Sequence, residues 1–263
     1  MSFPSMIHGT EGEQFSVYSE KRHPLGTLMA LPDGRSYRFA NIGGTAIATA
    51  RVCQSEVPGA NFDELVVPAA EAAEETTVEI TNGATTIAAN LFNEGYINVE
   101  DDAGEGHLYK IKSHEVEGAG SANFDVNIER GKFYDDDAGG NKHGLVVAWT
   151  SATTVGLTRN PYDDVIIHPS PPTAAVVGCT PRALAANKFG WLQVKGPASV
   201  LTEGTLVIAD SVQPSSSADG AVTPMTLTEG TPNTEIAANV GVCMEVAATT
   251  EESLIALQIP GFS

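Results

Sequence analysis

The side chains best suited to chemistry are carboxylates in one short acidic loop, from Glu100 to His107. Calcium binds six to eight oxygen ligands, and Asp101, Asp102 and Glu105 would supply several of them from a single turn. Their spacing departs from the EF-hand pattern, because the glutamate that closes that loop is missing. An acidic loop between two strands is equally typical of a solvated hairpin tip, and we favour that interpretation. The run Asp135-Asp136-Asp137 has the same two interpretations.

The other reactive side chains are not arranged for catalysis. His107 and His114 are seven residues apart in a segment with strand character, which places them on opposite faces of the strand. The sequence has no G-x-S-x-G nucleophile motif and no phosphate-binding G-x-x-x-x-G-K-[ST] loop. Its three cysteines are widely separated and odd in number, which indicates buried thiols and not a disulfide framework: Cys53, Cys179 and Cys243. We therefore expect no enzyme activity and no cofactor.

The charge balance argues against nucleic acids and membranes as partners. The sequence of 263 residues has 33 acidic and 14 basic side chains, a formal net charge of −19. Nucleic-acid affinity depends on Lys and Arg that neutralise phosphates, so DNA and anionic membranes would repel such a chain. The first 25 residues lack the apolar core of a secretory signal, and no stretch approaches the about 20 apolar residues of a membrane helix. We expect a protein made in a cytoplasm, with an acidic surface that faces solvent.

The elements that would position these loops are short strands. Groups of apolar and β-branched residues alternate with turn residues along most of the chain, which is typical of antiparallel β structure. Near the C-terminal end, the apolar groups 191–194 and 206–208 predict two strands, with turns at Gly196-Pro197 and Glu203-Gly204 in the connection between them. Three further signals predict tight hairpins, because glycine supplies the positive φ of such turns: Pro32-Asp33-Gly34, Asn82-Gly83 and Asp219-Gly220.

We predict an all-β fold of short antiparallel strands in two modules, each similar to a β-sandwich or β-barrel (β-tulip-like), with little helix. Prolines at 169–172 cannot donate ladder hydrogen bonds and favour an extended spacer, so this segment is expected to separate the modules. Trp149 and Trp191 lie in apolar groups, and each is expected to anchor a core. The predicted organisation is an extended arm over 1–14, a β domain over 15–168, a linker over 169–182 and a β module over 183–263.

The C-terminal part of the chain resembles a known family. From Trp191 to Ile259, turn glycines, a polar Asp-Gly hairpin and short strands follow one another as in the head decoration, or cement, proteins of tailed bacteriophages. Cys243 stands where these modules usually carry a small buried alanine. Two more segments, 18–44 and 90–114, resemble virion structural proteins of marine phages. The residues that carry the first resemblance are Gly204, Leu206, Asp210, Val212, Asp219, Gly220, Val222, Val240, Gly241, Val242, Glu245, Leu254 and Leu257.

The resemblance implies a structural protein that binds the outer surface of a phage capsid and stabilises it. Its expected partner is the major capsid protein, its expected state a homotrimer, and its expected location the exterior of the virion. The alternatives are another virion component, such as a major capsid, tail or head-fibre protein, and a calcium-dependent carbohydrate-binding β module. The residues expected at capsid or subunit contacts are Phe3, Met6, Ile7, Phe15 and Trp191.

Overall fold

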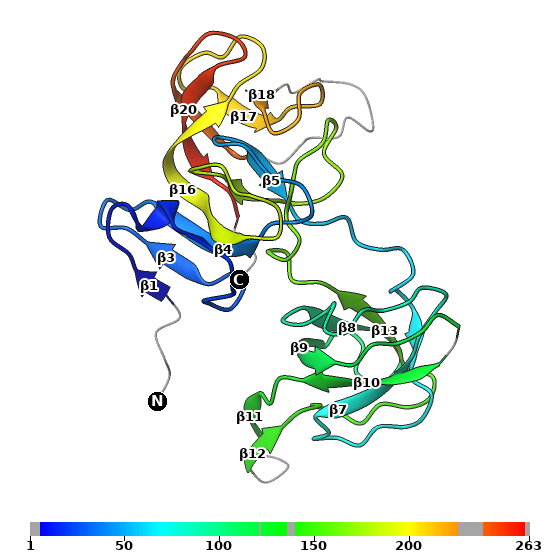
Figure 1. Ribbon diagram of the computed structural model, residues 1–263. Helices are drawn as coiled ribbons and strands as arrows, with labels where there is room; N and C mark the ends of the chain where they lie inside the picture. The colour runs from blue at the N-terminus through cyan, green and yellow to red at the C-terminus, as the bar shows by residue number, and fades with distance from the viewer. Residues whose placement is uncertain (1–5, 121, 136–139, 226–238, 261–263) are drawn as a thin grey trace. The chain divides into compact units, whose positions relative to one another are not determined.

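The chain forms two compact units of β structure (Figure 1), here called unit 1 (Met1–Val57 and Pro161–Ser263) and unit 2 (Pro58–Asn160). The structure, a computed structural model, describes residues 6–120, 122–135, 140–225 and 239–260. Within these ranges it has twenty strands and one short 3-10 helix, η1 (Glu13–Phe15), which confirms the predicted all-β class. No helix in the described ranges is long and apolar enough to cross a membrane.

The division into units differs from the boundaries that the sequence predicted at 168 and 183. Unit 2 is inserted into unit 1, because the chain leaves unit 1 after Val57 and returns to it at Pro161. The predicted linker 169–182 lies inside unit 1: Ser170 N donates to Asp219 Oδ1 at 2.9 Å, and Ser55 N donates to Ala175 O at 2.9 Å. Alternation of apolar residues specifies the faces of a strand but not its partners. The sequence pattern therefore could not indicate that segments before Val57 and after Pro161 form one unit.

One extended sheet makes up unit 1, with β16 as its shared strand. Along its main path the strand order is β1-β3-β4-β16-β20-β19-β17-β18. The short strands β2, β5, β14 and β15 pair alongside this path. Their bounds are β1 (Met6–His8), β2 (Val17–Tyr18), β3 (Leu28–Ala30), β4 (Ser36–Asn41), β5 (Val52–Gln54), β14 (Ile166–Ile167), β15 (Val176–Cys179), β16 (Phe189–Leu201), β17 (Ser211–Pro214), β18 (Val222–Pro224), β19 (Gly241–Glu245) and β20 (Glu252–Gln258).

The two halves of β16 serve two different cores. Its first half pairs with β4 and its second half with β20, with a bulge between Gln193 and Lys195. The first half contributes Trp191 to a core that also contains Phe39. The second half belongs to a nearly closed barrel, because a bridge from Thr202 to Val222 joins the end of β16 to β18. Each half of this long strand therefore covers a separate group of buried side chains.

The predicted turn at Gly196-Pro197 is wrong, since β16 continues through both residues. The side chain of Gln193 stabilises the bulge: its Nε2 donates to Pro197 O at 2.8 Å. Residues 206–208, which the sequence placed in a strand, form none: Leu206 is buried in the barrel core, whereas Val207 and Ile208 are exposed as the chain enters a turn. The hairpins at Asp33-Gly34 and Asp219-Gly220 are confirmed as the connections β3–β4 and β17–β18.

The N-terminal segment is not a free arm over its described length. Met6–His8 forms β1, which pairs in parallel with β3, and Gly9 N donates to Ala30 O at 3.0 Å. Ile7 packs against the core that contains Trp191. The predicted arm is therefore corrected from residue 6 onward: this part belongs to unit 1.

Unit 2 has a six-stranded sheet that covers a single core. The order is β6-β13-β8-β9-β10-β7, and a separate hairpin is formed by β11 and β12. Alternating apolar residues on these strands pack around Trp149, which is 1% exposed. The bounds are β6 (Leu65–Val66), β7 (Thr77–Thr81), β8 (Tyr96–Asp101), β9 (Leu108–His114), β10 (Asn123–Ile128), β11 (Lys132–Asp135), β12 (Gly140–His143) and β13 (Thr154–Thr158).

The hairpin predicted at Asn82-Gly83 is wrong. The partner of β7 is β10, not the segment 85–90. Asn82 is buried, and its Nδ2 donates to Thr85 O at 2.9 Å and to Gly118 O at 2.7 Å. The side-chain amide thus organises the connection that the sequence pattern assigned to a tight turn.

Candidate functional site

The acidic loop between β8 and β9 is held by its own carboxylates. The carboxylate of Asp102 accepts hydrogen bonds from the hydroxyls of Thr150 and Thr153. The bond from Thr150 is the main reason that the pKa of Asp102 is lowered. Asp101 Oδ1 accepts from Asp102 N at 2.9 Å. These contacts stabilise the turn, in which Asp102 has a positive φ of 63°.

The candidate metal ligands are not gathered into a metal site. Within the described ranges, no group of three or more His, Cys, Asp or Glu side chains could hold a metal ion, and this includes Asp101, Asp102 and Glu105. The second candidate run extends beyond the described residues, which end at Asp135 on this side. What the structure shows for Asp101 and Asp102 is their hydrogen bonding within and next to the loop.

The buried histidines act as hydrogen-bonding parts of the fold. His114 Nε2 accepts from Phe92 N at 3.0 Å, and its Nδ1 donates to Glu115 O at 2.7 Å. Burial lowers the pKa of His114, so its ring is neutral at pH 7. His168 lies between two carbonyl oxygens, 3.0 Å from Pro169 O and 2.8 Å from Ala221 O.

The three thiols are buried and unpaired, as the sequence predicted. Burial raises the pKa of Cys179 to about 12, and it also raises the pKa values of Cys53 and Cys243. The thiolate is the reactive form of cysteine, and at neutral pH all three side chains are in the less reactive thiol form.

A small hollow in unit 1 lies beside Phe15, one of the predicted contact residues. Phe15 ends η1 and is 43% exposed, and its carbonyl accepts from Arg182 Nη1 at 2.8 Å. The hollow has a volume of about 170 Å³. Tyr37 lines it, and burial raises the pKa of this tyrosine to about 12. The hollow combines the exposed ring of Phe15 with the Tyr37 phenol, the Gln193 amide and the Arg35 side chain.

The other predicted contact residues have different positions. Met6 and Ile7 are half-buried in β1, and Ile7 contributes to the core. The prediction that Trp191 lies at a contact surface is wrong. Its side chain is 1% exposed and contacts His23 and Phe39, so it anchors the core and is not accessible to a partner. Phe3 lies outside the described residues. Of the five, Phe15 alone has a side chain shown as exposed in the described ranges.

Sequence reasoning missed one exposed group in unit 1. Val207 and Ile208, assigned to a strand, are 58% and 64% exposed. The signal that could have found them is Asp210 immediately after a short apolar run, since Asp favours a turn and the positive φ of 75° at Ala209 bends the chain there. Comparison with protein-family models, curated proteins and solved structures gave no match to this chain.

Proposed function

We propose that this chain is a virion structural protein that binds the outer surface of a phage capsid and stabilises it as a decoration protein. Its partner is the major capsid protein of the same virion, and the decorating species is a homotrimer. It is made in the host cytoplasm and resides on the capsid exterior.

What supports the proposal is the resemblance of the C-terminal segment to head decoration proteins. The residues that carry it fall on β17, β18, β19 and β20 and on their turns, which are neighbours in the barrel of unit 1. The resemblance therefore concerns one spatial module and not scattered matches. This is the observation on which the proposal rests.

The distribution of charge fits a protein that coats a particle. Unit 2 carries 18 acidic and 6 basic side chains, a formal charge of −12, whereas the larger unit 1 carries 15 acidic and 8 basic ones. Like-charged surfaces keep particles dispersed in solution. An acidic inserted unit would serve this purpose, while the less charged unit 1 is better suited to contact with the shell.

The mechanism needs no chemistry. A protein that binds the assembled shell, and not the free capsid subunit, stabilises the shell by mass action. A trimer that contacts several subunits at once gains further from multivalency, because the second and third contacts form at a high effective concentration.

Co-sedimentation tests the proposal. Purified protein is mixed with shells assembled from the major capsid protein of the same virus, and in parallel with unassembled capsid subunits. We expect the protein to sediment with shells and to leave the subunits unbound. Failure to bind shells, together with formation of tubes or fibres by the protein alone, would favour a tail or head-fibre role.

A further inference from the structure

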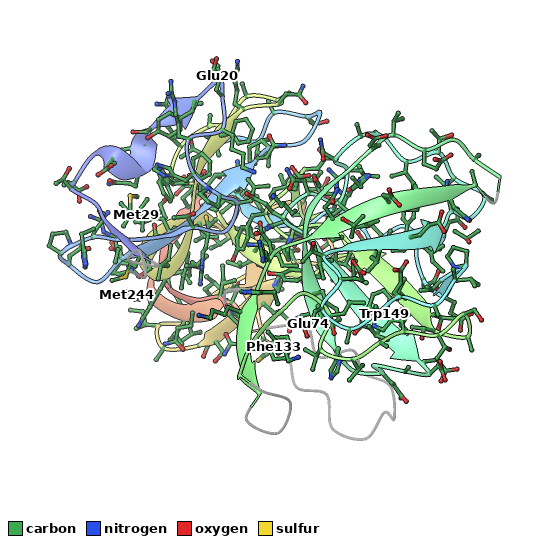
Figure 2. The ribbon with its side chains drawn as sticks, turned by 90° about the horizontal axis from the view of Figure 1, so that it is seen from below. Glu20, Met29, Glu74, Phe133, Trp149 and Met244 are labelled. Atoms are coloured by element: carbon green, nitrogen blue, oxygen red, sulfur yellow. The ribbon has the colours of Figure 1, made fainter. Side chains whose placement is uncertain are left out.

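Four exposed apolar side chains lie at one end of the barrel of unit 1. They are Val207, Ile208, Met244 and Val246, with exposed fractions of 58%, 64%, 46% and 40%. Two hydrogen bonds hold the two segments together: Ala209 N to Cys243 O and Cys243 N to Asp210 O, each 2.9 Å. We call these four residues the apolar end surface; Met244 is labelled in Figure 2.

This concentration is unusual for the molecule. Single exposed apolar residues are common and need no explanation. Here, four of the twelve large apolar side chains that are exposed in the described ranges come from two neighbouring segments. In Figure 1 the turn that follows β16 and the turn that precedes β20 meet at the same end of the barrel. Grouped exposure of this kind marks an interaction surface.

A small pocket adjoins the apolar end surface and gives it a charge preference. The pocket has a volume of about 170 Å³, and Val246 and Leu254 form its apolar wall. Two carboxylates, Glu245 and Glu252, also line it. Glu252 Oε1 lies 3.3 Å from Arg51 Nη1, whereas Glu245 has no ion pair within the described part of the chain. The pocket therefore offers an apolar wall and one carboxylate available to a cation.

We propose that the apolar end surface docks a segment of the capsid shell in which a lysine or arginine is flanked by apolar residues. The aliphatic stem of the basic residue packs on Val246 and Leu254 while its cationic group meets Glu245, since such side chains combine an apolar stem with a charged tip. The apolar flanks cover Val207, Ile208 and Met244.

Charge complementarity favours this occupant over a second copy of the chain. Asp210 and Glu245 border the surface, so two copies that met through this same face would bring carboxylates together. A basic partner has no such penalty. The inference deepens the proposed function and rests on it, because it names the side of the protein that faces the shell.

The test compares substitutions at the surface with matched ones in unit 2. The double variant Val207→Asp/Met244→Asp removes apolar contacts, and Glu245→Lys reverses the charge. Leu108→Asp, at a side chain that is 60% exposed, and Glu105→Lys are the controls. Shell binding is measured by co-sedimentation over a range of protein concentrations, and urea unfolding verifies that each variant folds. We expect Kd to rise at least 30-fold for the double variant and at least 10-fold for Glu245→Lys, and to stay within twofold for the controls.

Glu245→Gln separates charge from folding. It keeps the shape of the side chain, and we expect it to weaken binding at low salt and to reduce the salt dependence of Kd, since it removes one ion pair. This variant remains informative if the double variant is unstable.

Three outcomes would overturn the inference, and they differ from one another. If the wild-type protein ignores shells, the proposed function fails, and the docking surface fails with it. If the wild-type protein binds shells and the surface variants bind equally well, the docking surface is wrong while the proposed function stands. If the double variant binds shells normally but changes the oligomeric state in sedimentation equilibrium, the surface belongs to a contact between copies.

Discussion

At the scale of single residues, His114 makes the stability of unit 2 depend on pH. Its Nε2 accepts from Phe92 N and its Nδ1 donates to Glu115 O, an arrangement that requires the neutral ring. Burial lowers the pKa of His114 below its usual value of 6.5. As the pH falls below about 6.5, the unfolded chain therefore binds a proton that the folded chain does not, and the free energy of unfolding decreases.

We expect unit 2 of the wild-type protein to lose stability between pH 7 and pH 5, by no more than about 1.4 kcal/mol per pH unit from this group. His114→Gln should cost about 1–3 kcal/mol at pH 7, because the bond to the buried Phe92 N–H is disturbed. Its further loss at pH 5 should be smaller than that of the wild type. Urea unfolding followed by Trp149 fluorescence, with Trp191→Phe in every protein compared, measures both effects. His143→Gln is the control, and a His114→Gln variant with the wild-type pH profile would contradict the prediction.

Burial was easier to predict at this scale than hydrogen bonding. Trp149 and Trp191 were expected in cores, and both are 1% exposed, because a tryptophan within an apolar strand group usually turns inward. The role of His114 depends on a backbone N–H donor 22 residues away in the sequence. Only the pairing of strands and loops brings these two groups together, so no local pattern could indicate it.

At the scale of elements, the bulge in β16 is the feature that the sequence misassigned. A glycine followed by a proline usually marks a turn, yet here Gly196 allows one strand to change partners from β4 to β20. Its φ is 89°, and a Cβ built on it would lie 3.0 Å from Arg35 Cγ and 3.2 Å from Arg35 Cα. Glycine is required at position 196 because the backbone passes close to Arg35, and not because the chain reverses there.

The glycine at the bulge can be tested against a second one of the same conformation. Gly34 has a φ of 90°, but a Cβ there would meet nothing within 4 Å. We expect Gly34→Ala to cost about 1–2 kcal/mol for the left-handed backbone alone. Gly196→Ala should cost at least about 1 kcal/mol more, because Arg35 Cα cannot move aside easily. Urea unfolding of the two variants, followed by Trp191 fluorescence in proteins that also carry Trp149→Phe, gives the difference. Equal losses would show that the contact with Arg35 makes no energetic contribution.

Sequence reasoning succeeded for elements that are local. The hairpins β3–β4 and β17–β18 were predicted, since an Asp-Gly turn and its flanking strands lie within a few residues. It failed for β7, whose partner β10 lies more than forty residues later. The dipeptide Asn82-Gly83 matches the pattern of a tight turn. In the structure, however, Asn82 is buried and its side-chain amide donates to two carbonyl groups.

At the scale of the whole molecule, the insertion of unit 2 into unit 1 could not be read from the sequence. The all-β class followed from composition and turn spacing, and it is confirmed. The discontinuity depends on pairs such as β4 with β16, which join residues 36–41 to residues 189–195. The segment 169–182 resembled a linker, because its proline content was visible in the sequence while its hydrogen bonds to Asp219 and Ser55 were not.

The insertion predicts that each unit folds without the other. Their cores are separate, with Trp149 in the core of unit 2 and Trp191 in a core of unit 1. Gln54 on β5 pairs with Ile166 on β14, so the chain leaves unit 1 shortly after one strand and re-enters it shortly before that strand's neighbour. Joining Val57 to Pro161 through a short Gly-Ser linker should therefore close unit 1 without strain. We expect this shortened chain and the fragment 58–160 each to unfold cooperatively in urea.

Each unit contains one tryptophan, which makes the prediction measurable in the full chain. With Trp191→Phe, fluorescence reports unit 2 through Trp149, and with Trp149→Phe it reports unit 1 through Trp191. We expect the two single-tryptophan proteins to show different urea midpoints, each shared with the corresponding isolated unit that carries the same tryptophan. Replacing a buried tryptophan by phenylalanine leaves a cavity that costs about 1–2 kcal/mol of stability. Each midpoint is therefore compared only with that of the isolated unit that carries the same tryptophan. Coincident transitions in the full chain, combined with a shortened chain that shows no cooperative unfolding, would mean that unit 1 depends on the insertion for its stability.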